Sequence, residues 1–289
     1  MKWLRPSCQI SQAELNDLEA AMKRYYATPP RGYHEEALQS SSDWTQPDLF
    51  FHNRIVSFSA PHWNVLDVGC GPANACSHFS RRGAQYTGVD LAEAQLIANK
   101  KRYPAANFVC LHWRDLPSLR AKFDLVTSFF TLEHVVNPRK FIEASASRVR
   151  PGGLWAILCP NYLERGFLPS QHFFGREAGG IKAKLKQSMW LEAAIEIVDR
   201  YVCYPFLIHR ARNMARHGGA WVINLRPVCL EVQSWALDWD AVYMVSEDEV
   251  ADYVSSLGFT IVERGVNFRS SRGEEKIPDF CYVVGKNCG

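Results

Sequence analysis

Apolar and polar positions follow two different periods along the middle of the chain. Short apolar runs alternate with amphipathic stretches between residues 64 and 158. The runs predict strands at residues 64–68, 86–90, 107–111, 123–128 and 153–158, and the stretches predict helices at residues 73–82, 92–102 and 138–149. Strands that alternate with helices at this interval are typical of right-handed βαβ units. We therefore predict an α/β fold with a parallel sheet.

The first part of the chain has a helical pattern. Residues 11–26 carry apolar side chains at helical spacing, and Ser11 with Glu14 forms a capping-box pattern at the start of this stretch. The polar, turn-rich residues 28–47 predict a connecting segment before a second helix at residues 49–58.

The alternation of strands and helices stops after Asn161. The residues that follow are rich in aromatic side chains and contain a predicted helix at residues 181–200; another helix at 246–257 and strands at 259–263 and 280–284 come last. We expect three parts: an N-terminal helical cap at residues 1–60, a core at residues 61–161 and 241–289, and an inserted lid at residues 162–240.

Two closely spaced glycines follow the first predicted strand. Gly69 and Gly71 end the apolar run that begins at Val65, and Asp90 ends the second run about twenty positions later. Glycine lets the backbone approach a ligand where a Cβ would clash, and the helix that follows offers unpaired N–H groups. An acid at the tip of the second strand can accept hydrogen bonds from ribose hydroxyls. This arrangement predicts a nucleoside-containing cofactor at the carboxyl ends of the strands.

Two details bear on which cofactor binds. The third glycine of the dinucleotide fingerprint is missing, because Asn74 stands at its position. Asp67 lies inside the first strand, beside the turn, where a carboxylate would repel phosphates but suits an ammonium group.

Four blocks of sequence, in this order and at this spacing, resemble the class I S-adenosylmethionine-dependent methyltransferases. They are Val65-Leu66-Asp67-Val68-Gly69-Cys70-Gly71-Pro72-Ala73, Gly88-Val89-Asp90, Phe123-Asp124-Leu125-Val126 through Leu132-Glu133-His134-Val135, and Arg148-Val149-Arg150-Pro151-Gly152-Gly153-Leu154. The resemblance is strong over residues 61–161 and weak over the C-terminal part, and it is closest to the subgroup of ubiquinone, polysaccharide and natural-product methyltransferases. It implies a Rossmann-like, doubly wound, seven-stranded sheet with an antiparallel last strand, and S-adenosylmethionine as the cofactor.

The resemblance also implies which residues contact the cofactor. Asp67, Gly69 and Gly71 would surround its methionine half, with Asp67 acting on the amino group directly or through water, and Asp90 would accept from the ribose. The alternatives are an ordinary βα turn with a buried cap and, for Asp90, the N-cap of the next helix. The predicted cofactor contacts are Asp67, Gly69, Cys70, Gly71, Asp90, Leu91, His112, Trp113 and Phe129.

The predicted adenine pocket departs from the family pattern. Relatives commonly carry a Gly-Asp pair after the third strand, and Leu111-His112 stands at those two positions here. His112 could hydrogen-bond adenine through one ring nitrogen, and Trp113 could stack on its face. Alternatively, both side chains only pack the loop.

The acceptor side has four candidate catalytic residues: His172, His134, Asp238 and Asp240. An imidazole titrates near neutral pH, so His172, shortly after the fifth strand, is the predicted general base. His134 follows the fourth strand, next to Glu133, and the two aspartates lie where related enzymes place substrate-facing residues. The alternatives are a loop-fixing Glu-His pair, a surface histidine and helix-capping acids. A lone Glu-His pair is too little for a metal site, so no metal is predicted.

Residues 181–217 combine basic and apolar side chains. Seven Lys and Arg residues stand against three acids in this stretch, with apolar residues interleaved. An amphipathic lid of this kind would attract an anionic acceptor or touch acidic lipid headgroups, which predicts a peripheral membrane contact. The alternative is a solvated face around an apolar stripe.

Composition adds broad limits. The residues are 47% apolar and 22% charged, as in ordinary globular proteins, and a net charge of +3 is too small to argue for nucleic acid as a partner. No apolar run approaches the ~20 residues of a spanning helix, and residues 1–6 lack the apolar core of a secretion signal. Nine cysteines without a Cys-x-x-Cys pair favour reduced thiols. We expect a cytoplasmic protein, and the oligomeric state stays open.

These features predict an enzyme that methylates a small-molecule acceptor. Methyl transfer from a sulfonium is a one-step displacement that needs mainly alignment, and a hydroxyl acceptor also needs a base. The candidate histidines and acids therefore favour O-methylation of a biosynthetic intermediate. The alternatives are N-methylation, a non-catalytic binding protein with the same fold, and a nicotinamide-dependent oxidoreductase, which the missing third glycine and Asp67 disfavour.

Overall fold

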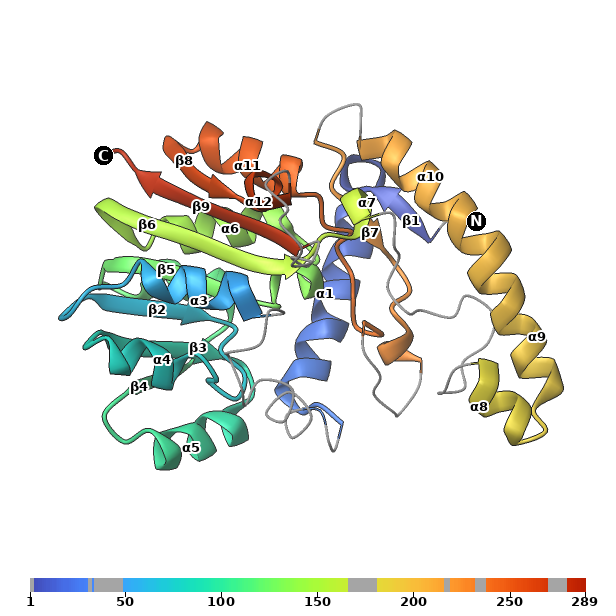
Figure 1. Cartoon of the computed structure of the whole chain (residues 1–289), viewed down its shortest axis with the longest axis horizontal. Helices are drawn as coiled ribbons and strands as arrows, with labels where there is room; N and C mark the ends of the chain where they lie inside the picture. The colour runs from blue at the N-terminus through green and yellow to red at the C-terminus, as the bar shows by residue number, and fades with distance from the viewer. Residues whose placement is uncertain are drawn as a thin grey trace.

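A seven-stranded sheet forms the centre of the computed structural model, which describes residues 3–30, 33, 49–165, 181–215, 219–231, 238–269 and 280–289. The strand order is β4-β3-β2-β5-β6-β9-β8 (Figure 1). The bounds are β2 Asn64–Val68, β3 Gln85–Asp90, β4 Asn107–Cys110, β5 Phe123–Phe129, β6 Val149–Pro160, β8 Phe259–Arg264 and β9 Phe280–Asn287. Strands β2 to β6 pair in parallel, and β9 pairs antiparallel with both β6 and β8. The predicted seven-stranded sheet with an antiparallel last strand is confirmed.

One strand is longer than its apolar run. β6 begins at Val149 rather than at residue 153, because Val149 already pairs with Phe123 before a register shift near Leu125. Gly152 takes up a φ of +75° in this stretch, and a Cβ on Gly153 would lie 2.9 Å from the Asp124 carbonyl oxygen. The two glycines therefore let an irregular strand pass close to its neighbour.

Alternate residues of the strands face two separate apolar cores. Along β6, Leu154, Ala156 and Leu158 belong to one core, and Trp155 and Ile157 belong to the other. Helices α3 (Phe50–Ser57), α4 (Cys76–Arg81) and α5 (Glu93–Arg102) contribute to the first core, whereas α6 (Pro138–Ala146) and α11 (Glu247–Ser256) contribute to the second. Both faces of the sheet are thus covered, as a parallel sheet requires.

The N-terminal segment is joined to the inserted region. Helix α1 (Gln12–Ala27) begins with the predicted capping box of Ser11 and Glu14. Strand β1 (Leu4–Pro6), which the sequence pattern does not reveal, pairs antiparallel with β7 (Val222–Asn224). Residues near the start of the chain therefore form a small sheet with residues of the insert, and the division into cap, core and lid stays a prediction.

The insert contains more than the one predicted helix. Helix α7 (Tyr162–Arg165) is followed, among the described residues, by α8 (Ile181–Lys186) and α9 (Trp190–Val198). The chain bends between α8 and α9, where Ser188 has a φ of +60°. The prediction of a single helix over residues 181–200 is therefore wrong. Helix α9 then continues through a π-helical turn, η5 (Asp199–Cys203), into α10 (Tyr204–Ala215).

Neither membrane spans nor disulfides are found in the described parts of the chain. No helix there is long and apolar enough to cross a bilayer. All nine cysteines are free thiols, and six of them are buried, whereas Cys8, Cys110 and Cys288 are exposed.

The packing of α3 gives a test of the architecture. Phe51 has no exposed surface and stacks on Tyr282 of β9 with a ring separation of 4.6 Å. Because α3 packs as part of a core layer, Phe51→Ala should lower the free energy of unfolding in urea by about 3–5 kcal/mol. Phe206→Ala, at a residue that is 60% exposed, is the matched control and should change it by no more than about 0.5 kcal/mol. Equal effects of the two substitutions would contradict this packing.

Candidate functional site

The turn after β2 has the conformation that only glycine adopts freely. Gly69 and Gly71 have φ values of +75° and +45°. The N–H groups of Gly69 and Cys70 donate to the carbonyl oxygen of Val89 at 2.8 and 3.0 Å, which holds the turn against the end of β3. A Cβ on Gly71 would meet no atom within 4 Å. The backbone of the turn therefore borders open space at Gly71, where a ligand can approach it.

Asp90 is oriented by two backbone groups. Its Oδ2 accepts from the Gly71 N–H at 2.8 Å, and its Oδ1 accepts from the Ala92 N–H at 3.0 Å. The second contact lies ahead of α5, whose N-cap is Ala92 without a side-chain cap, so the alternative role of Asp90 as the helix N-cap is wrong. An ionised carboxylate has about four acceptor positions, so each oxygen keeps capacity for a hydroxyl donor. The fixed, half-buried carboxylate is suited to bind a ribose through both oxygens.

Asp67 is a buried acid with an unused acceptor. Its Oδ2 accepts from the Tyr86 hydroxyl at 2.6 Å, and its Oδ1 has no hydrogen-bond partner among the described residues. Burial raises the pKa of Asp67 to about 7, and the nearby Asp90 carboxylate adds to this effect while the Tyr86 hydrogen bond opposes it. A cationic amino group bound near Oδ1 would supply the missing partner and favour the ionised acid. The residues present thus fit the amino-acid end of S-adenosylmethionine.

The other predicted contacts beside the turn lie in this region. Cys70 is buried, Leu91 is half-buried directly after Asp90, and Phe129 ends β5. The Phe129 ring stacks on His52 of α3 with a centroid separation of 5.3 Å. Burial lowers the pKa of His52 to about 3, so this ring is neutral at ordinary pH. Sequence reasoning missed His52, because it lies on an amphipathic helix far from the motifs.

His112 and Trp113 make protein contacts at the start of the 3-10 helix η3 (Trp113–Ser118). The Nδ1 of His112 accepts from the Arg114 N–H at 3.3 Å, and its Nε2 lies 3.8 Å from the Glu19 carboxylate of α1. The Trp113 ring meets Phe141 edge-on and carries the Arg114 guanidinium over it. These are contacts of the loop-packing alternative, and an adenine contact from either side chain stays a prediction.

A second polar cluster lies beyond the end of β5, on the 3-10 helix η4 (Leu132–His134). The His134 Nδ1 lies 3.2 Å from the Asp240 carbonyl oxygen and 3.6 Å from its Oδ1, and Nε2 lies 3.7 Å from Glu133 Oε1. Burial disfavours a charged imidazole here, but the carboxylates of Asp240 and Glu133 outweigh it and raise the pKa of His134. Burial also raises the pKa of Glu133 to about 7. The His134 side chain keeps 15% of its surface exposed, so it remains accessible.

Tyrosine hydroxyls complete this cluster. Tyr26 and Tyr33 donate to Asp240 Oδ2 at 2.8 and 3.2 Å, and Tyr162 donates to Asp238 Oδ1 at 2.8 Å. Three of the four catalytic candidates, His134, Asp238 and Asp240, are therefore part of one hydrogen-bonded region. Sequence reasoning missed the three tyrosines, because nothing in their local spacing distinguishes them from ordinary core or turn residues.

The cluster is connected to the glycine turn. The Thr131 hydroxyl donates to the Gly69 carbonyl oxygen at 3.3 Å, three residues before His134. The pKa of Tyr33 is raised well above its usual range by burial, then by Asp240 and more weakly by Asp90, so this hydroxyl lies within the field of both carboxylates. His172, the predicted base, lies outside the described residues. No group of three metal-binding side chains occurs among the residues that are described.

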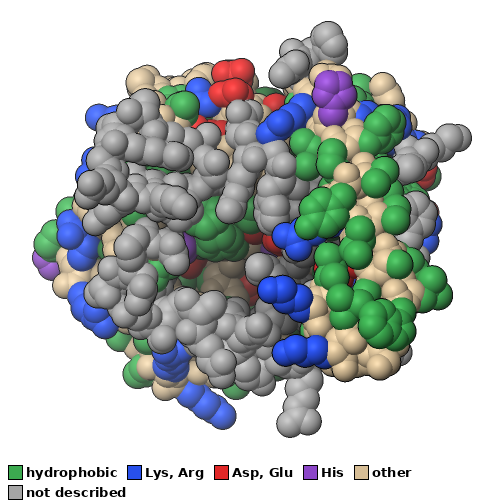
Figure 2. Space-filling view, turned by 45° about the vertical axis from the view of Figure 1, so that its right-hand side comes forward, with side chains coloured by type: hydrophobic (Ala, Val, Ile, Leu, Met, Phe, Trp, Pro, Cys, Tyr) green, Lys and Arg blue, Asp and Glu red, His purple; other side chains and the backbone are tan. Residues whose placement is uncertain are grey.

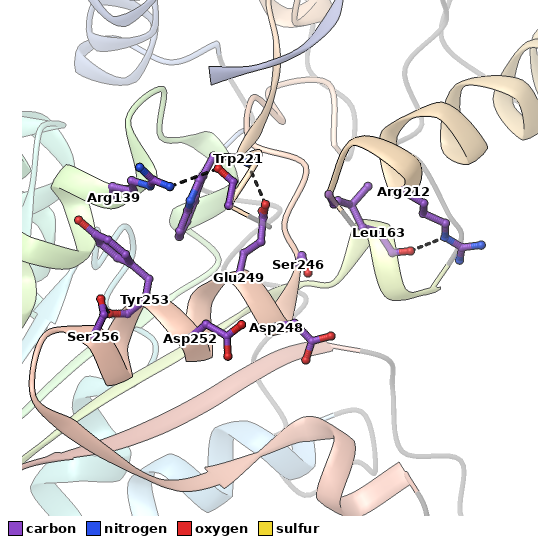
Figure 3. A pocket seen from close by; sticks show the side chains of 12 residues that line it. Arg139, Leu163, Arg212, Trp221, Ser246, Asp248, Glu249, Asp252, Tyr253 and Ser256 are labelled. Atoms are coloured by element: carbon purple, nitrogen blue, oxygen red, sulfur yellow. Dashed lines mark hydrogen bonds between the residues drawn. The ribbon is translucent and has the colours of Figure 1, made fainter. Parts of the chain in front are cut away.

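A separate cavity of about 660 Å³ lies between α10, β7 and α11 (Figure 3). Its lining includes Arg139, Arg212, Trp221, Asp248 and Tyr253, and it contains none of the site residues predicted from the sequence. The Arg139 guanidinium lies over the rings of Trp221 and Tyr253, and it donates to the Gly219 carbonyl oxygen at 3.2 Å. The lining charges have both signs, so the cavity does not indicate a ligand of one charge.

The close approach of Gly69 to Thr131 is testable. A Cβ at residue 69 would collide with the Thr131 side chain, with Cγ2 only 2.5 Å away, whereas a Cβ on Gly258 would meet nothing within 4 Å. Both glycines have positive φ, so Gly258→Ala measures the backbone strain alone, about 1–2 kcal/mol. Thermal and urea unfolding should show a larger loss for Gly69→Ala, and adding Thr131→Ala should recover part of it. Equal losses for the two glycine variants, or no recovery, would show that the collision is not limiting.

Comparison with known proteins gives the same assignment. Residues 66–157 match the family model described as a methyltransferase domain. The ubiquinone biosynthesis O-methyltransferase of Nitrobacter winogradskyi is 29% identical over 158 residues, which cover 53% of this chain and 55% of that protein. The enzyme of the same name from Idiomarina loihiensis is 39% identical over 94 residues, 31% of this chain and 39% of that protein. The chain thus spans about half the length, or less, of these curated relatives.

Solved structures agree on the fold. A chain from the complex of the Haloferax volcanii Trm112 methyltransferase activator with a methyltransferase aligns with a TM-score of 0.52 at 13% identity, covering 93% of this chain and 98% of that one. The Burkholderia thailandensis 1,6-didemethyltoxoflavin-N1-methyltransferase, solved with S-adenosylhomocysteine, aligns with a TM-score of 0.50 at 13% identity, covering 97% and 92%. The sheet order, the glycine turn and the matched domain agree: residues 66–157 form a domain of the class I S-adenosylmethionine-dependent methyltransferase type, and the chain has the Rossmann-like methyltransferase fold.

Proposed function

We propose that this protein transfers the methyl group of S-adenosylmethionine to the hydroxyl group of a small-molecule acceptor. The observation that carries the proposal is the His134 side chain, which lies between the carboxylates of Glu133 and Asp240 in the region joined to the glycine turn. The two relatives described above are O-methyltransferases by name, which supports an oxygen acceptor.

The acceptor chemistry follows from the need for a base. A neutral hydroxyl is a weak nucleophile and must lose its proton as the methyl group transfers, whereas an amine can attack unassisted. His134 is held by the Asp240 carbonyl and by two carboxylates that stabilise its protonated form. In this proposal the imidazole takes the hydroxyl proton while the turn and Asp90 hold the donor in line. His172 stays a second candidate base.

Binding of the cofactor comes first in any test. S-adenosylmethionine and S-adenosylhomocysteine should both give a heat of binding in isothermal titration with the full chain. Absence of any heat at millimolar ligand would remove the proposed activity together with the cofactor. Transfer of a labelled methyl group to panels of phenols and of amines then separates O-methylation from N-methylation, and transfer to amines alone would overturn the hydroxyl acceptor.

Asp67 should release a proton when the cofactor binds. Its pKa of about 7 leaves the acid mostly protonated near pH 6, and a bound ammonium group lowers that pKa, so binding at about pH 6 should release up to about one proton. The release should fade above the raised pKa, where the acid is already ionised. Titration in buffers of different ionisation enthalpy measures it directly.

The matched variants locate this proton. Asp67→Asn should abolish the release and weaken binding, while Asp115→Asn makes the same substitution at an exposed position and should change neither. Proton release that persists in Asp67→Asn would place the ammonium group elsewhere.

His134 should control the pH dependence of turnover. A general base must be unprotonated to accept a proton. We therefore expect kcat to be low in acid and to rise as the pH passes the pKa of His134, which lies above the ordinary value of 6.5 for histidine. His134→Gln should lower kcat by about 10²–10⁴ with little change in cofactor affinity. Asp240→Asn, which removes a carboxylate that favours the charged ring, should shift the rising limb to lower pH.

The exposed His209 of α10 provides the control for this series. His209→Gln should leave both kcat and the pH profile unchanged. Unchanged turnover in His134→Gln would end its role as base, and a loss of turnover confined to His172→Ala would transfer that role to His172.

A further inference from the structure

The outer face of the arm formed by α9, η5 and α10 is apolar and uncovered. Leu191 is 72% exposed, and Trp190, Tyr201, Val202 and Phe206 each expose 60% or more of their surface. Figure 2 shows closely spaced green side chains, with tan atoms between them, along one side of the molecule. Isolated exposed apolar residues are common, but a contiguous stripe of large ones indicates a binding surface.

The same helical arm packs onto the protein through its other face. Ala193, Cys203, Leu207 and Ala211 are buried, and they alternate with the exposed apolar residues at helical spacing. Residues 190–215 are helical throughout, a length of roughly 39 Å at 1.5 Å per residue. The inner face therefore anchors the arm, and the outer stripe is not required to hold it in place.

Most basic side chains of residues 181–215 are exposed, whereas the acidic ones are buried or half-buried. Lys182, Lys186 and Arg200 are exposed. The acids of residues 181–215 are withdrawn from the surface: Asp199 is buried, and Glu196 is buried in an ion pair with Lys184 at 2.9 Å, while Glu192 is half-buried. Figure 2 shows Lys and Arg side chains along an edge of the apolar stripe. The surface presented by this segment is thus both apolar and positive.

We propose that this face docks onto an anionic lipid surface, with the arm lying in the plane of the membrane interface. Apolar residues inserted below the headgroups, aromatic rings at headgroup level and Lys or Arg beside them are the features of an interfacial helix. A second copy of the chain fits less well, because pairing this face with itself would bring the exposed cations together without an exposed acid from the same segment. The inference concerns a surface outside the methyl-transfer site, so it stands or falls independently of the proposed reaction.

The test is co-sedimentation of the full chain with phosphatidylcholine vesicles, with and without phosphatidylglycerol. We expect binding to the anionic vesicles, weaker binding at high salt and little binding to the neutral ones. Leu191→Ser with Phe206→Ser should weaken binding at least ~10-fold, since two exposed anchors lose their apolar surface. Ile97→Ser, at a residue of α5 that is 54% exposed, is the matched control and should bind as the parent does.

The electrostatic contribution has its own variants. Lys186→Gln with Arg200→Gln should weaken binding about fivefold for each charge removed. Lys100→Gln with Lys101→Gln on the exposed part of α5 makes the same change in net charge and should have little effect. Circular dichroism checks that each variant keeps its fold, and the charge variants test the surface independently of the apolar ones.

Three results would overturn the proposal. The first is no binding of the parent chain to anionic vesicles. The second is binding that the arm variants and the α5 controls weaken equally, which would mean that another surface is used. The third is a dimer in analytical ultracentrifugation that Leu191→Ser with Phe206→Ser dissociates, because the stripe would then be occupied by a second copy.

Discussion

The contact between Gly69 and Thr131 is the steric constraint on which the site depends. With no Cβ at residue 69, the loop after β2 and the loop after β5 approach until the Thr131 hydroxyl reaches the Gly69 carbonyl oxygen. This contact sets the distance between the glycine turn after β2 and the segment that carries Glu133 and His134. Any larger residue at position 69 would push these two loops apart, because its Cβ would meet the Thr131 side chain.

Electrostatics in this region follow from burial rather than from net charge. Asp67 and Glu133 are both withdrawn from water, and each has a pKa of about 7 and one oxygen without a hydrogen-bond partner among the described residues. A buried acid of this kind is sensitive to any cation that arrives nearby. For Glu133 this cation is the protonated ring of His134, and for Asp67 we propose that it is the ammonium group of the cofactor.

The inserted region contributes to two surfaces with different requirements. Strand β7 of this region pairs with β1. The residues that follow β7 bring Asp238 to Tyr162, and Asp240 to Tyr26 and His134. Along α9 and α10 it turns only one face inward. Asp238 and Asp240 accept hydrogen bonds from tyrosine hydroxyls within the protein, whereas the apolar stripe on the arm has large side chains in contact with solvent. The same segment therefore contributes both to the polar cluster around His134 and to the surface that we propose docks onto lipid.

Much of the fold was determined by the sequence alone, because strands and amphipathic helices have local periods that can be read residue by residue. The seven strands, the glycine turn, the position of Asp90 and the capping box at Ser11 all follow from neighbouring residues. Tertiary structure decided the remaining contacts of the site, because they join residues that are far apart in the chain. No local pattern pairs β1 with β7, directs Tyr26 and Tyr33 to Asp240, or brings Glu19 beside His112. Such contacts form only when both apolar cores pack against the sheet, because polar groups that become buried there must find hydrogen-bond partners among their new neighbours.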